Sequence, residues 1–60
     1  MTVKNTIKDI ENGSMHIMLI DDDTGEILLS TIWQNLIPEQ YLDKNVIKHE
    51  GREYEMRLFI

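Results

Sequence analysis

The chain has 60 residues, with eleven Asp or Glu against six Lys or Arg and a formal net charge of −5. This length allows one domain, residues 1–60, with a small core, and the absence of cysteine excludes disulfides and cysteine-based zinc sites. The longest uninterrupted apolar run, Ile17–Ile20, is too short for a membrane span, and no apolar stretch follows Met1 as it would in a signal peptide, so we expect a soluble, cytoplasmic protein.

The charges are unevenly distributed along the chain. No base lies between Lys8 and Lys44, whereas this stretch contains Asp9, Glu11, Asp21, Asp22, Asp23, Glu26, Glu39 and Asp43. One interpretation is a solvated acidic surface that keeps the protein soluble. The other is a negative surface that binds a positive partner and accelerates the encounter with it. Nucleic acid is a poor candidate ligand, because phosphate contacts require Lys and Arg.

Residues 1–13 form either a short helix or a loose N-terminal arm. Val3, Ile7 and Ile10 have helical spacing, Thr2 is a possible N-cap, and Asn12–Gly13 is a stop signal. A segment this short at a terminus can also remain loose.

Two strands follow and are predicted to form a hairpin. Met15–Ile20 and Glu26–Trp33 are both apolar with β-type alternation, so that Ile17 and Leu19 face one side of the sheet. Asp21–Gly25 is the turn, in which Gly25 can adopt the left-handed conformation and the aspartates can bond turn amides.

A helix and a third strand complete the predicted fold. Pro38 suits the first position of a helix that continues to about Val46, with Glu39 favoured in the first turn by the helix dipole. His49–Arg52 is predicted as a turn around Gly51, and Tyr54–Ile60 as a strand. We therefore expect an α+β fold over residues 15–60, β-β-α-β, with a three-stranded antiparallel sheet and one helix.

A single helix covers one face of this sheet and leaves apolar side chains on the other. We expect a homodimer that covers the second face and pairs the C-terminal strand, which would lie at an edge. The competing possibility is that the N-terminal segment folds over the second face.

No constellation of residues indicates catalysis, a metal or a cofactor, so we expect a binding protein and not an enzyme. Asp21–Glu26 resembles a calcium loop only superficially, because Gly25 falls at loop position five and Ile32 at position twelve. His16 and His49 have no partners at ligand or catalytic spacing. Core filling is the default interpretation of the aromatic residues. For Tyr41 a second interpretation stands beside it, since an aromatic residue between Glu39 and Asp43 suits an interface anchor.

The run Met18-Leu19-Ile20-Asp21-Asp22-Asp23-Thr24-Gly25 resembles the hairpin of the small acidic uracil-DNA glycosylase inhibitors of Bacillus phages. Ile37-Pro38-Glu39-Gln40-Tyr41 is similar to that family's helix start if one residue is inserted. Glu55-Met56-Arg57-Leu58 is similar to its last strand. The resemblance spans about Met15 to Ile60 at low identity. Leu42 stands where the family has an acid, and the second strand is aliphatic where the family is rich in Tyr.

The resemblance implies a DNA-mimicking homodimer that blocks the DNA-binding groove of host uracil-DNA glycosylase and so disables base excision repair during host takeover. Acids would replace DNA phosphates, and an apolar cleft would receive the wedge that the enzyme inserts into DNA. The residues implied in partner binding are Glu39, Tyr41, Leu42, Asp43, Asp21, Asp22 and Asp23. Two alternatives stay open: an inhibitor of another basic host or defence protein, such as a CRISPR effector, and a structural or regulatory module whose acids serve solubility.

Overall fold

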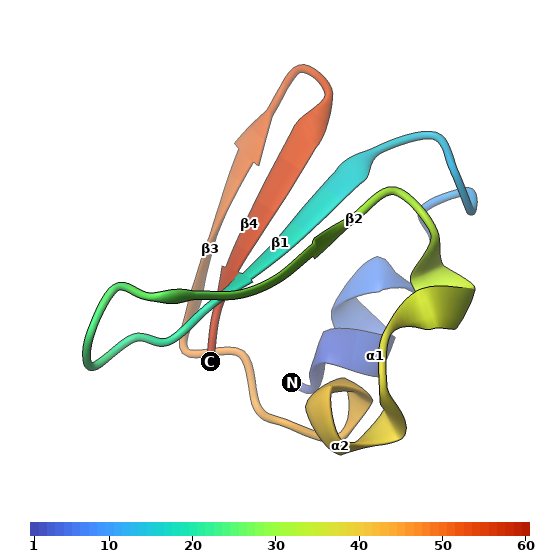
Figure 1. The fold of residues 1–60 in the computed structure, drawn as a ribbon. Helices are drawn as coiled ribbons and strands as arrows, with labels where there is room; N and C mark the ends of the chain where they lie inside the picture. The colour runs from blue at the N-terminus through green and yellow to red at the C-terminus, as the bar shows by residue number, and fades with distance from the viewer.

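The computed structural model describes residues 1–60 and consists of a four-stranded sheet with two short helices packed against one face (Figure 1). In chain order the elements are α1 (Val3–Ile7), β1 (His16–Ile20), β2 (Ile27–Thr31), the 3-10 helix η1 (Gln34–Leu36), α2 (Glu39–Leu42), β3 (Lys48–Arg52) and β4 (Glu55–Phe59). The predicted α+β class is confirmed. Neither helix has the length and apolar character needed to cross a membrane.

The sheet is mixed and has the strand order β2-β1-β4-β3. The β1–β2 and β3–β4 pairs are antiparallel, whereas β1 and β4 run parallel. The prediction of three antiparallel strands and one helix therefore differs from the structure in strand number, in the parallel pair and in the additional helix. The dimer was expected to pair the C-terminal strand if that strand lay at an edge, but β4 lies between β1 and β3, so both of its sides are already hydrogen-bonded.

The additional strand comes from the segment that was predicted as a turn around Gly51. Gly51 instead lies within β3, opposite Met56, and does not have a positive φ. The chain reverses at Glu53 and Tyr54, between the paired residues Arg52 and Glu55, without any positive φ angle. Because this turn uses no glycine or asparagine, it lacks the residues that ordinarily mark a two-residue hairpin in a sequence.

The β1–β2 hairpin confirms its prediction. Ile17 and Leu19 are buried and alternate with the more exposed His16 and Met18. The turn begins after Ile20, where the pairing register shifts, and Gly25 adopts a φ of 76°. That conformation is accessible to glycine at little cost.

The N-terminal segment is a helix, and the predicted N-cap is confirmed. The Thr2 hydroxyl accepts a hydrogen bond from the Asn5 backbone N–H at 3.2 Å. The segment is also tied to the chain after α2, because the Val3 N–H donates to the Lys44 carbonyl at 2.9 Å and the Val46 N–H donates to the Met1 carbonyl at 2.7 Å. The helix α1 therefore lies on the same side of the sheet as α2, and the possibility that it covers the second face is wrong (Figure 1).

The core lies between this helical layer and the sheet. It comprises Val3, Ile7, Ile17, Leu19, Ile37 and Leu58. Only 7 of 60 residues are buried, the seventh being Ile20. A core of this size leaves little reserve of stability, because a domain of this length buries only about 60% of the surface that its unfolded chain exposes.

Candidate functional site: two acidic surfaces

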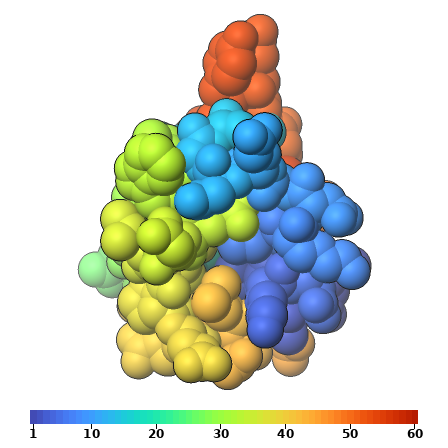
Figure 2. Space-filling model, turned by 90° about the vertical axis from the view of Figure 1, so that its right-hand side faces the viewer, coloured from blue at the N-terminus to red at the C-terminus, as the bar shows by residue number.

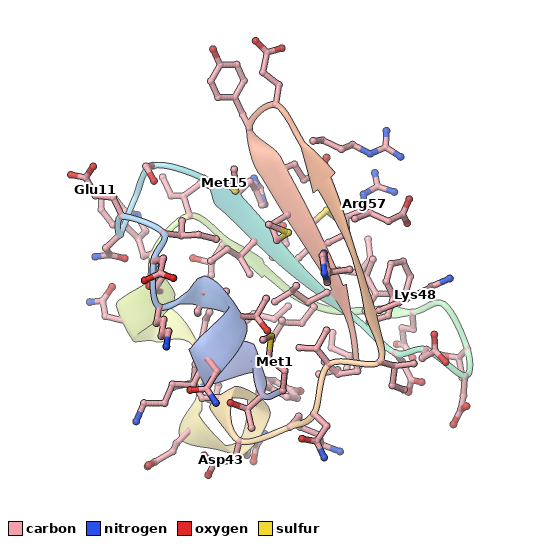
Figure 3. All side chains as sticks on the ribbon, turned by 180° about the vertical axis from the view of Figure 1, so that it is seen from behind. Met1, Glu11, Met15, Asp43, Lys48 and Arg57 are labelled. Atoms are coloured by element: carbon pink, nitrogen blue, oxygen red, sulfur yellow. The ribbon has the colours of Figure 1, made fainter.

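The residues implied in partner binding lie in two separate places. Asp21, Asp22 and Asp23 form the β1–β2 turn, which projects from one end of the sheet (Figure 1). Glu39, Tyr41, Leu42 and Asp43 belong to α2 and its C-cap, in the helical layer. Figure 3 shows the same separation from behind, with Asp43 on the side of the helices and the acidic turn on the opposite side. The fold therefore does not unite the two sets in one surface.

The turn holds its aspartates on a well-bonded backbone. The Asp21 carboxylate accepts the Asp23 N–H at 2.8 Å, and the Asp21 carbonyl accepts the Gly25 N–H at 2.8 Å. The Asp22 N–H donates to the carbonyl of Ile60 at 3.1 Å, which ties the turn to the C-terminus. Asp22 and Asp23 are exposed and Asp21 is half-buried. No three acidic or histidine side chains lie close enough together to hold a metal ion.

The helix α2 is a single turn and shorter than predicted. Pro38 precedes the helix in an extended conformation, with φ −59° and ψ 144°, and does not occupy its first position. The chain leaves the helix after Leu42 because residues 44–46 pair with residues 1–3 of the N-terminal segment, through a bridge between Thr2 and Asn45.

The helix divides its side chains between the core and the solvent. Tyr41 and Leu42 are half-buried and pack against the hydrophobic core, whereas Glu39 and Asp43 are exposed. Tyr41 therefore supports the chain's own fold and offers only part of its ring to a partner.

Two exposed apolar residues near α2 were not assigned to a site from the sequence. Trp33 is 48% exposed and Leu36 is 61% exposed, at the start and end of the turn that contains η1. Core filling was the expected role of Trp33, and this expectation is wrong. Trp33 and Leu36 are three residues apart, which is the spacing of one 3-10 turn, but the run Trp33–Ile37 has no other feature that indicates a helix.

The acidic side chains are almost all free of basic partners. Only Glu55, of the eleven acids, forms a salt bridge, with the Arg57 Nε 3.0 Å from the Glu55 Oε1. No polar side-chain atom is buried without a hydrogen bond, and none of the acidic residues is buried. The negative charge is thus presented outward on both surfaces.

The sheet face opposite the helices, here called the open face, has one apolar half and one charged half. Its β1–β2 half carries Met18, Ile20 and Ile27, with His16 hydrogen-bonded to Ser30. The register places charged residues on its β3–β4 half, namely Lys48, Glu50, Arg52, Glu55 and Arg57. The Lys48 ammonium lies 4.6 Å from the centre of the Phe59 ring. The apolar part of the open face is therefore limited to β1, β2 and Phe59.

No protein-family model, no curated protein and no solved structure matches this chain. The resemblance to the glycosylase inhibitors stays a prediction that depends on the sequence motifs described above.

Proposed function

We propose that the protein is an inhibitor of host uracil-DNA glycosylase, which it binds in the cytoplasm by occupying the DNA-binding groove in place of DNA. The observation that carries the proposal is the lack of basic partners for the acids, of which only Glu55 forms a salt bridge. Unpaired, exposed carboxylates on a small protein can take the place of phosphates in a basic groove. The sequence resemblance supplies the identity of the target.

In this proposal the acids mainly select a basic partner and raise the rate of association with it, and contribute less to the binding affinity. Exposed ion pairs contribute about 0–1 kcal/mol each, so tight binding requires buried apolar surface as well. In the helical layer, acids and partly exposed apolar residues occur together: Glu39 and Asp43 flank Tyr41 and Leu42. This combination favours the helical layer over the acidic turn as the inhibitory surface.

A second candidate is inhibition of a different basic nucleic-acid-binding protein, such as a CRISPR effector. It is favoured by one observation, the packing of Tyr41 and Leu42 against the chain's own core. An open apolar cleft for a glycosylase wedge would require these side chains to be more exposed than they are.

An excision assay tests the glycosylase proposal. Uracil excision from a labelled single-stranded oligonucleotide is measured with and without a molar excess of the protein, and we expect excision to stop. A DNA glycosylase of unrelated fold serves as the control and should remain active. Undiminished uracil excision contradicts the proposal, and inhibition of both enzymes would indicate nonspecific acidic competition.

The proposal includes a homodimer formed through the apolar half of the open face. Ile27 is 55% exposed and pairs with Ile20, so a second copy packed on β1 and β2 would cover it. Sedimentation equilibrium should give twice the chain mass of 7.1 kDa. Ile27→Lys should give the single mass. Ile47→Lys is the control, because Ile47 is 63% exposed and lies outside this surface; this variant should keep the doubled mass. A single mass for the unmodified chain would contradict the dimer.

A further inference from the structure

Trp33 and Leu36, here called the η1 patch, are exposed apolar residues outside the buried core. Trp33 is 48% exposed and Leu36 is 61% exposed. Neither residue belongs to the hydrophobic core. Figure 2 looks onto this side of the molecule, where residues 10–15, η1 and α2 meet. Exposed tryptophan on such a surface is enriched among the residues that dominate binding energy in protein interfaces.

The η1 patch is held in a fixed conformation by the loop before β1. The Gln34 N–H donates to the Asn12 side-chain oxygen at 2.6 Å, and the Gln34 side-chain amide donates to the Ile10 carbonyl at 2.7 Å. The Trp33 N–H donates to the Thr31 hydroxyl at 3.0 Å. Binding through a preorganised patch loses less conformational entropy than binding through a mobile one.

The Trp33 ring also lies directly against Gly13. A Cβ atom at position 13 would stand 2.7 Å from the Trp33 Cζ3, and Gly13 has a φ of 84°. Glycine at this position thus lets the indole rest on the backbone while a large part of the ring stays exposed.

The segments that border the η1 patch carry several exposed acids. Glu11 lies in the loop that is bonded to η1, and Glu39 and Asp43 belong to α2 and its C-cap. All three are exposed, and no base occurs between residues 9 and 43. Figure 3 places Glu11 and Asp43 on the side of the helices, at opposite ends of this layer.

This charge pattern decides which occupant the η1 patch fits. Two copies that met through it would bring carboxylates against carboxylates, which is unfavourable. A basic partner would instead place its positive groups opposite Glu11, Glu39 and Asp43 while an apolar pocket received the side chains of the η1 patch.

We infer that Trp33 and Leu36 are the apolar anchor through which the protein holds its basic, nucleic-acid-binding target. The inference rests on the proposed function and deepens it, because it assigns the binding affinity to two residues that are not among the partner-binding residues implied by the sequence resemblance. Tyr41 and Leu42 then support the helical layer from within, and the acids around the η1 patch orient the partner.

Inhibition by alanine variants tests the inference. Trp33→Ala and Leu36→Ala are compared with the unmodified protein in the uracil-excision assay, and the inhibition constant should rise about 30-fold for Trp33→Ala and at least several-fold for Leu36→Ala. Tyr54→Ala is the matched control, since Tyr54 is an aromatic residue that is 73% exposed at the distant β3–β4 turn. It should inhibit like the unmodified protein.

Leu36→Ala keeps the test valid if Trp33→Ala fails to fold. Leu36 is more exposed than Trp33, so its truncation leaves no buried cavity. Urea unfolding of each variant gives the folded fraction used in the comparison. Equal inhibition by both variants and the unmodified protein overturns the inference while the proposed function stands. Failure of the unmodified protein to inhibit refutes the proposed function itself and, with it, this assignment of the partner.

Discussion

Leu19→Ala should remove most of the stability of the fold. Leu19 is completely buried in β1, one of the two central strands, where it pairs with Leu29 on one side and Leu58 on the other. Truncation of a buried leucine to alanine costs about 2–5 kcal/mol through lost burial and the cavity that remains. A 60-residue chain has a total free energy of unfolding of about 3–9 kcal/mol at ordinary values per residue. The variant is therefore expected to be largely unfolded or close to it.

Urea unfolding followed by circular dichroism measures this effect. All proteins are compared at one concentration, because dimerisation would make the midpoint depend on concentration. Ile47→Ala is the control, since Ile47 is an aliphatic residue that is 63% exposed, and its unfolding free energy should change by less than about 0.5 kcal/mol. A Leu19→Ala midpoint equal to that of the control would contradict the described core.

The second large effect concerns the two acidic surfaces. The triple variant Glu11→Gln, Glu39→Gln, Asp43→Asn should associate with the target about tenfold more slowly than the unmodified protein at low salt. The triple variant Asp21→Asn, Asp22→Asn, Asp23→Asn removes the same charge from the turn and should slow association by less than about threefold. Both changes leave side-chain shape nearly unaltered, and Asn at position 21 can still accept the Asp23 N–H.

The difference between the two variants follows from distance and screening. The molecule extends 28 Å along its longest axis, and the acidic turn projects from the end away from the helices (Figure 1). Screening by salt limits the reach of an exposed charge to about 8 Å at physiological ionic strength. Association rates measured by stopped flow at two salt concentrations distinguish the surfaces, since only the helical-layer variant should also reduce the salt dependence strongly. Equal slowing by the two variants would show that total charge, and not the helical layer, governs the encounter.

The sequence by itself determined the features that depend on neighbouring residues. Strand alternation over residues 15–20 and 26–33 predicted the hairpin and placed Ile17 and Leu19 on one face of it, and Thr2 predicted the start of α1. These features follow from local geometry, because side-chain alternation and helix capping involve residues only a few positions apart. The α+β class followed from them, since both kinds of element had to share one small core.

Only the tertiary structure decided the topology and the location of the exposed side chains. The parallel pairing of β1 with β4 joins residues such as Leu19 and Leu58, and no local pattern specifies a contact so distant in the chain. The burial of β4 between two strands depended on β3, whose turn at Glu53–Tyr54 has no glycine signal. The continuous acidic stretch of the sequence became two surfaces, and Trp33 lies outside the buried core with its ring against Gly13. Composition fixes how many acids and apolar residues a chain has, whereas long-range packing fixes which of them share a surface.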